Sequence, residues 1–307
     1  MLYFGEPRGA LELLKRGVPL CGLVHGRKGG EGYRHLLSAL TSLAEERGAP
    51  LPRWRKPNLS DPELIEQFKA LKPDLIISGF YPRAISAEVL ALAPGYNVHP
   101  SDLPKWRGPD PAYWVLRSGE TRTAICVHQL TPALDEGAIA HRVEVQVRSR
   151  ESGGALALRL ERQAARVIAD FTADLYKRAE SEGIHVAELP LTLTPQEGEA
   201  SWAPLVSPDE VEIDWSAPAQ EVDQLVRASS PDPGAFSALD TGFQPELLVV
   251  YRGRPHFDER LESAPVGAPI IIKGQCYIKC GVGVYRLDRV KVGRKEMSGA
   301  RLAELLS

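Results

Sequence analysis

Residues 73–100 read PDLIISGFYPRAISAEVLALAPGYNVHP. The apolar run 74–78 has the length and composition of a buried strand, residues 86–92 have helical spacing, and residues 96–99 predict a second strand. Short joints with proline and glycine separate these elements. Strand, helix and strand in turn are typical of an open, mostly parallel sheet, whose ligands bind beyond the carboxyl ends of the strands.

The same alternation continues on both sides of this unit. Before it we expect strands at 2–4 and 19–24 and helices at 7–17, 33–47 and 61–71. After it we expect a strand at 121–130, another that runs through residue 147, and a long helix at 154–182. The sequence therefore predicts an α/β domain with a Rossmann-like sheet.

A change of composition marks the domain organisation. Residues 189–206 are irregular and rich in proline, threonine and serine, which is typical of a linker. Beyond them, one helix near 219–228 is followed by short strands separated by glycine and proline, a pattern that favours a small β-barrel. We expect a catalytic domain over 1–188, a linker over 189–206 and a C-terminal OB-like domain over 207–307.

Composition excludes several classes of protein. A formal charge of −3 and a pI near 6.2 give no general attraction to nucleic acid. Four scattered cysteines cannot form a disulfide framework, and Cys276 and Cys280 lack the second pair that a zinc site needs, so we expect no metal. The amino-terminal apolar stretch is too short for a signal peptide or a membrane span. We expect a soluble, cytoplasmic protein without a membrane partner.

The glycine-rich stretch GRKGGEG at 26–32 fits neither the dinucleotide fingerprint nor the P-loop. Its glycines more simply make a flexible, basic loop. A nicotinamide-dependent dehydrogenase is therefore not favoured.

Asn97 and His99 form a polar pair at the end of the strand 96–99. Side chains two residues apart in a strand project from the same face, whereas Val98 points into the packing. An amide and an imidazole placed together suit a carbonyl that becomes an oxyanion, because the amide can donate and the imidazole can donate or carry a proton. The alternative is a structural histidine.

Asp135, in the turn ALDEG at 133–137, follows the next strand. A mixed sheet can bring this carboxylate beside His99, where it would orient the ring, keep it charged or accept a proton. The alternative is an Asx-type turn residue with no catalytic part.

These residues belong to two linked motifs that resemble the folate-dependent formyltransferase family. The motifs are NVHPSDLPKWRG at 97–108 and LDEG at 134–137. The family includes methionyl-tRNA formyltransferase, glycinamide ribonucleotide formyltransferase and the sugar-nucleotide N-formyltransferases. Matching positions are Asn97, His99, Ser101, Leu103, Pro104, Arg107, Gly108, Asp135 and Gly137. The stretches EVEIDWS, VRASSPDPGAFSAL and GRKEMSGARLAELL look like the C-terminal domain that the tRNA and sugar enzymes share.

The resemblance implies a transfer of a formyl group from 10-formyltetrahydrofolate to an amine. It implies that Asn97 and a protonated His99 stabilise the oxyanion, that Asp135 keeps His99 charged or assists proton removal, and that no metal is needed. The folate would lie against residues that the resemblance places at its pocket: Tyr81, Arg83, Ala84, Ile85, Leu134 and Gly137. Alternatively, Tyr81 and Ile85 are ordinary core residues.

The acceptor is predicted to be a small-molecule amine, either an amino sugar nucleotide or an amino acid or diamine. The residues that we expect near it are Ser101, Asp102, Arg107 and Asp110. Asp102 stands where the family has leucine, and Asp110 lies in a turn that normally carries small or basic residues, so the two carboxylates can bind a second positive charge. Alternatively, Asp102 faces solvent and Asp110 caps the helix that starts near Pro111.

A tRNA partner is not favoured, because the basic loop of the methionyl-tRNA enzymes is absent. Arg27, Lys28 and Arg34 retain some positive charge, whereas binding of nucleic acid draws on several phosphate contacts. Three alternatives stay open: a divergent methionyl-tRNA formyltransferase, a hydrolase that releases formate from 10-formyltetrahydrofolate, and a noncatalytic binding protein.

Overall fold

The computed structural model describes residues 1–26, 30–240 and 245–307. Contacts within the chain divide it into two compact units. The first unit comprises residues 1–109, 122–145 and 159–202, and the second comprises 110–121, 146–158 and 203–307. This division groups residues by contact, and the domain boundaries expected from the sequence stay a prediction.

A seven-stranded sheet in the order β3-β2-β1-β4-β5-β6-β7 forms the centre of the first unit. The strands are β1 (Leu2–Gly5), β2 (Gly22–His25), β3 (Arg53–Arg55), β4 (Ile76–Gly79), β5 (Gly95–His99), β6 (Arg122–Gln129) and β7 (Ile139–Gln146). β1 to β5 are parallel, and β6 runs antiparallel to β5. The predicted Rossmann-like, mostly parallel sheet is confirmed.

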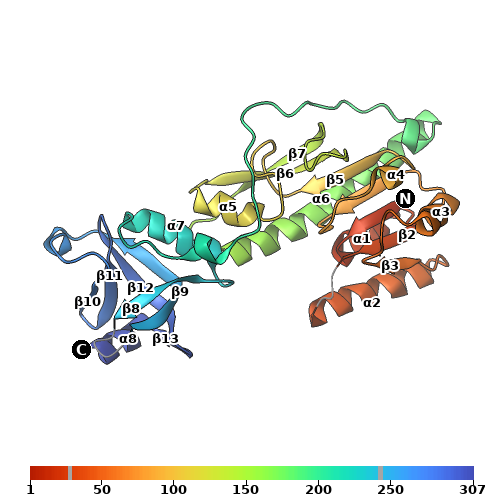
Figure 1. Ribbon diagram of the computed structural model, residues 1–307. Coiled ribbons are helices and arrows are strands. Elements are labelled where there is room, and N and C mark those ends of the chain that lie inside the picture. Colours follow the sequence, from red (N-terminus) through yellow and green to blue (C-terminus); the bar gives the residue numbers. More distant parts are fainter. Residues whose placement is uncertain (27–29, 241–244) are drawn as a thin grey trace. The chain divides into compact units, whose positions relative to one another are not determined.

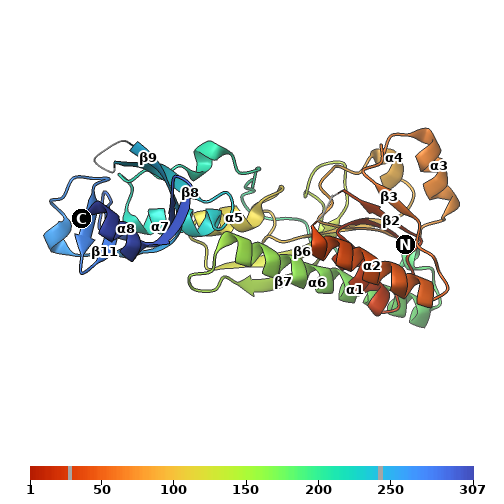
Figure 2. The ribbon, with the colours of Figure 1, turned by 90° about the horizontal axis from the view of Figure 1, so that it is seen from below.

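Helices cover both faces of this sheet. They are α1 (Pro7–Lys15), α2 (Glu31–Glu46), α3 (Pro62–Ala70), α4 (Ala87–Leu90) and α6 (Gly153–Glu182), followed by the 3₁₀ turn η1 (Val186–Glu188). Figure 2 shows α1, α2 and α6 on one face and α3 and α4 on the other. On α6, Phe171 packs edge-on against Tyr96 of β5 and stacks on His141 of β7. These ring contacts hold the strand that carries Asn97 and His99 against a long helix.

A six-stranded sheet forms the second unit, with the order β10-β11-β12-β9-β8 and with β13 paired to β12. Its strands are β8 (Ala235–Asp240), β9 (Pro245–His256), β10 (Pro269–Ile272), β11 (Gln275–Lys279), β12 (Val284–Val292) and β13 (Lys295–Ser298). The helices of this unit are α5 (Pro111–Arg117), α7 (Ala219–Ser229) and α8 (Gly299–Leu306). Its 3₁₀ turns are η2 (Pro208–Val211) and η3 (Glu259–Leu261). The strands pair antiparallel. Figure 1 shows α7 and α8 beside this sheet, and both helices contribute to its apolar core. The predicted C-terminal β domain is confirmed.

Of the helices that the structure describes, none has both the length and the apolar character needed to cross a membrane.

Candidate active site

β5 and β6 bring three polar side chains to one place. Asn97 and His99 share a face of β5, with the buried Val98 between them on the other face. In the antiparallel pairing Asn97 stands opposite His128 of β6, and His99 stands opposite Cys126. Directly opposed residues in a sheet lie on the same face, so His128 joins the predicted pair.

Both ring nitrogens of His99 face an acceptor. Nε2 lies 2.8 Å from the carbonyl oxygen of Trp106, which can only accept, so this nitrogen carries a proton. Nδ1 lies 3.6 Å from Oδ2 of Asp135. Burial lowers the pKa of His99, and the Asp135 carboxylate and the Trp106 carbonyl offset that effect only in part. Burial thus favours a neutral ring, whereas the family resemblance implies a protonated one.

Asp135 is held from several sides in the turn after β6. It is 7% exposed and adopts a left-handed backbone with φ of 54°. Oδ2 accepts the backbone N–H of Gly108 at 3.0 Å, and Oδ1 accepts the amide of Asn97 at 3.3 Å. Burial alone would raise the pKa of this carboxyl, but the hydrogen bond from His128, the charges of His99 and His128 and the Gly108 N–H hold the pKa below its usual value. Asp135 is therefore ionised at neutral pH.

His128 is a site residue that the sequence analysis missed. Its Nδ1 lies 2.9 Å from the carbonyl oxygen of Gln129, and its Nε2 lies 3.1 Å from Asn97 Nδ2 and 3.4 Å from Asp135 Oδ1. The signal was a histidine near the end of the strand that leads into the ALDEG turn. Because Asn97 directs its amide nitrogen at His128 and Asp135, donation to an oxyanion requires that one of these contacts be exchanged.

The sequence of this chain matches models of a known protein family. The model of the formyl transferase family matches residues 27–172, and the model of the formyl transferase C-terminal domain matches residues 205–305. The chain belongs to the formyltransferase family. The first match covers both motifs of the first unit, and the second match covers the β domain of the second unit.

Solved structures share the fold of this chain at low sequence identity. HypX from Aquifex aeolicus in complex with tetrahydrofolic acid is 18% identical, with a TM-score of 0.61 over 100% of this chain and 47% of that chain. The chain thus spans about half the length of HypX. An N-formyltransferase from Helicobacter canadensis, in complex with folinic acid and dTDP-3-aminofucose, is 11% identical, with a TM-score of 0.60 over 96% of this chain and 98% of that one. A sugar N-formyltransferase from a Shewanella species is 13% identical, with a TM-score of 0.59 over 84% and 98%.

The residues predicted to bind folate differ in exposure. Tyr81 and Ile85 are half-buried and pack against the apolar cluster of the first unit, as the core alternative expected. Arg83 is exposed and donates to the carbonyl of Pro57 at 2.9 Å. Ala84 and Leu134 are exposed, Leu134 at 55%, whereas Gly137 is buried. The exposed Leu134, next to Asp135, offers apolar surface to the ring system of a folate. The binding role of all six residues stays a prediction.

Each residue predicted to bind the acceptor is bonded within the protein. The fully buried Ser101 donates to the carbonyl of Lys105 at 2.7 Å. Asp102 accepts two hydrogen bonds from Arg142, at 2.7 and 2.9 Å. The guanidinium of Arg107 lies 3.2 Å from Glu136 and donates to Gln196 at 2.7 and 3.1 Å.

Asp110 stands at the N-cap position of α5, as its structural alternative expected. Within the described part of the chain its side chain makes no capping hydrogen bond and instead accepts the backbone N–H of Val206 at 3.2 Å. Neither Asp102 nor Asp110 is thus an uncommitted carboxylate.

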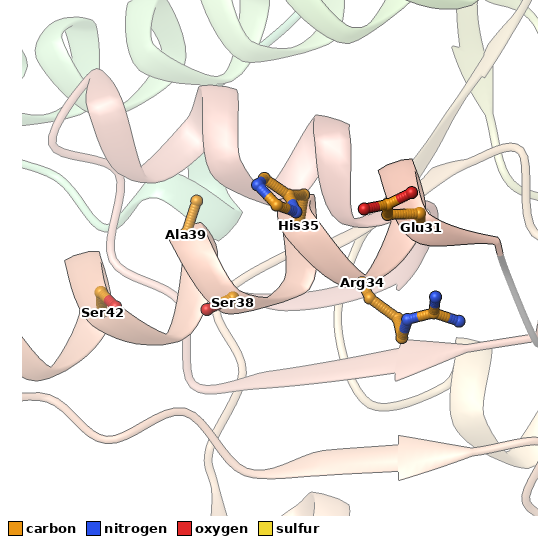
Figure 3. Close-up of a pocket in the computed structure, with 6 residues that line it drawn as sticks. All are labelled: Glu31, Arg34, His35, Ser38, Ala39 and Ser42. Carbon is orange, nitrogen blue, oxygen red and sulfur yellow. The ribbon is translucent and has the colours of Figure 1, made fainter.

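The basic residues weighed for a tRNA partner are described only in part. Arg27 and Lys28 lie outside the described residues. Arg34 lies on α2 and, with Glu31, His35, Ser38, Ala39 and Ser42, lines a hollow of about 560 Å³ that Figure 3 shows. Among the described residues around this hollow, none is a predicted catalytic or folate-binding residue.

Proposed function

We propose that this formyltransferase moves a formyl group from 10-formyltetrahydrofolate to the primary amine of a small molecule. The observation that carries the proposal is the cluster at the end of β5, where Asp135 lies 3.3 Å from Asn97 and 3.6 Å from His99. The cluster combines a hydrogen-bond donor, a neutral base and an ionised carboxylate, three groups that can assist acyl transfer to an amine.

10-Formyltetrahydrofolate supplies an activated formyl group, which an amine can take over without a covalent enzyme intermediate. As the amine nitrogen bonds to the formyl carbon, negative charge develops on the formyl oxygen. Asn97 stabilises this oxyanion by turning an amide N–H toward it from Asp135 or His128. Loss of one such donor typically slows an enzyme by about 100- to 1000-fold.

His99 and Asp135 handle the proton. The attacking amine loses a proton as its bond to carbon forms, and neutral His99 presents Nδ1 as the acceptor because Nε2 is committed to Trp106. Ionised Asp135, 3.6 Å away, stabilises the resulting imidazolium. His99 then returns the proton to the folate nitrogen as the bond from that nitrogen to the formyl carbon breaks.

The choice of folate as donor is supported by the relatives. HypX is described in complex with tetrahydrofolic acid, and the Helicobacter canadensis enzyme in complex with folinic acid. Among the residues that we propose to bind the folate, the exposed Leu134 and the half-buried Tyr81 and Ile85 supply apolar surface.

For the acceptor we favour an amino sugar nucleotide. Two relatives that align over most of this chain are an N-formyltransferase in complex with dTDP-3-aminofucose and a sugar N-formyltransferase. The argument for a cationic amino acid or diamine rested on the charges of Asp102 and Asp110. Arg142 neutralises Asp102, and Asp110 accepts from a backbone N–H, so that argument loses its basis.

A mass-spectrometric screen of acceptors tests the proposal. Purified protein and 10-formyltetrahydrofolate are incubated in parallel with amino sugar nucleotides, ornithine, lysine and methionyl-tRNA, and Asn97→Ala serves as the control. We expect the mass of an amino sugar nucleotide to increase by one formyl group. The rate of this formylation should be about 100- to 1000-fold lower with the Asn97→Ala control. Formylation of methionyl-tRNA alone would instead identify a translation-initiation enzyme, and formate release without any amine would identify a hydrolase.

A further inference from the structure

A segment that the sequence suggested to be a linker lies against both catalytic motifs. Thr194 and Ile139 exchange two backbone hydrogen bonds, at 2.8 and 2.9 Å, just after the LDEG turn. Farther along, the carbonyl of Ser201 accepts the backbone N–H of Arg107 at 3.0 Å. Residues 194–202 are thus fixed at one end to the second motif and at the other to the first, all within the first unit.

Between these two points, the side chain of Gln196 joins the motifs directly. Its Nε2 donates to the carbonyl oxygens of Asp135 and Gly137, both at 2.8 Å. Its Oε1 accepts from Nε and from a terminal nitrogen of Arg107, at 3.1 and 2.7 Å. Both amide hydrogens and the amide oxygen are used, so the side chain has one orientation that satisfies all its partners.

This bridge holds a backbone that needs support. Asp135 has φ of 54°, a conformation that costs a non-glycine residue free energy and persists only where the surroundings enforce it. Gln196 binds the carbonyl of Asp135 itself and that of Gly137, two residues later. The direction in which the Asp135 carboxylate leaves the turn depends on this local backbone.

We propose that Gln196 is a positioning residue that holds Asp135 in the geometry needed beside His99. The inference rests on the proposed formyl transfer for its catalytic meaning. Gln196 itself does not touch the reacting atoms but acts through the turn at 135–137. Arg107, which we expected near the acceptor, has a part in the same bridge.

Three variants separate this role from a general effect on the fold. Gln196→Ala removes every hydrogen bond that the side chain makes to Arg107, Asp135 and Gly137. Gln196→Glu keeps its length and the oxygen that faces Arg107 but places a second oxygen against two carbonyls. Glu197→Gln changes an exposed neighbour on the same segment and is the matched control. Thermal melting of all three confirms that each variant is folded.

The first readout does not need turnover. Histidine NMR titration of the full-length protein, with the His99 signal assigned by its loss in His99→Gln, reports how strongly Asp135 acts on the ring. We expect the His99 titration midpoint to fall in Gln196→Ala, because the charge of Asp135 supports the protonated ring. An unchanged midpoint in both Gln196 variants, equal to that of Glu197→Gln, would overturn the inference.

The second readout uses 10-formyltetrahydrofolate and the acceptor that the screen identifies. We expect kcat to fall by about 100-fold in both Gln196 variants, as small misplacements of catalytic groups do. Full kcat in either variant would overturn the inference. If the parent protein turns over no acceptor, the proposed function fails, and the NMR titration still decides the role of Gln196.

Discussion

Gly108 donates its backbone N–H to Oδ2 of Asp135 over 3.0 Å. The two residues stand 27 positions apart, at the end of one motif and inside the other. Gly108 has φ of 112°, a conformation that side chains disfavour, so glycine is the residue that allows the N–H to face the carboxylate. A charge-assisted bond of this kind supports the ionised form of Asp135.

Substitution of Gly108 by alanine should therefore impair both stability and turnover. We expect Gly108→Ala to lower the free energy of unfolding by about 1 to 3 kcal/mol, the range for strained backbone. kcat should fall at the same time, because the N–H turns away from Asp135. Urea denaturation and steady-state kinetics measure the two effects.

Gly48→Ala is the matched control for this strain. Gly48 has φ of 67°, and a side chain there would meet none of the described atoms within 4 Å. The control should lose stability but keep kcat. An equal loss of kcat in both variants would argue against a specific role for the Gly108 bond.

Stability should decrease in mild acid because of His99. Burial lowers the pKa of His99 from its ordinary 6.5, so below that pH the unfolded chain binds a proton that the folded protein does not. The contribution of His99 to the free energy of unfolding is complete above pH 6.5. As the pH falls below 6.5, this contribution decreases by at most about 1.4 kcal/mol per pH unit, until the pH reaches the pKa of His99 in the folded protein. The lowered pKa of Asp135 adds a loss that begins near its ordinary 3.8.

Urea denaturation at pH 7.5, 6.5 and 5.5 (about one unit on either side of the ordinary histidine pKa) measures the effect. We expect His99→Gln to flatten the dependence between the two lower values, because glutamine does not titrate. Parallel curves for the parent and the variant would mean that His99 has the same pKa in both states.

Asp102→Asn should leave recognition of the acceptor unchanged. The carboxylate is paired with Arg142, and both side chains are more than a third exposed, at 36% and 41%. Exposed pairs of this kind contribute about 0 to 1 kcal/mol. We expect Asp102→Asn to change the stability only slightly and to keep the parent KM for the acceptor. Arg142→Gln should change the stability by an equal amount. A large rise in KM for Asp102→Asn alone would restore the idea that Asp102 binds a cationic acceptor.

Tyr81→Phe tests the predicted folate pocket. The hydroxyl of Tyr81 is buried and has no hydrogen-bond partner within residues 1–26, 30–240 and 245–307. An unpaired buried hydroxyl costs about 1 to 3 kcal/mol, so phenylalanine should keep or raise the melting temperature. We expect the KM for 10-formyltetrahydrofolate to rise, with kcat at saturation unchanged. An unchanged KM would assign Tyr81 to the core alone.

The sequence predicted most of the first unit because its signals are local. Alternation placed Asn97 and His99 on one face of β5, and apolar spacing located α2 and α6 to within two residues. β3 was missed because Arg53–Arg55 has no apolar run. Such short edge strands depend on a neighbouring strand rather than on their own residues.

The side-chain partners could not be predicted in the same way. Asp102 and Arg142 are 40 residues apart, and Gln196 reaches Asp135 across 61 residues, so only the folded chain brings them together. Asp135 was predicted from its place in the turn after β6 and again from the family motif, whereas His128 and Gln196 were not predicted. Side chains that act by holding other groups leave no chemical pattern of their own in one sequence.

The attachment of residues 194–202 to the two motifs matters for protein engineering. An engineer who trims the gene to a minimal catalytic core would naturally stop at Glu182, where α6 ends. That cut discards Gln196 and Ser201 while keeping every strand of the parallel sheet. The first stop codon worth trying lies beyond Trp202, the last residue that belongs to the first unit.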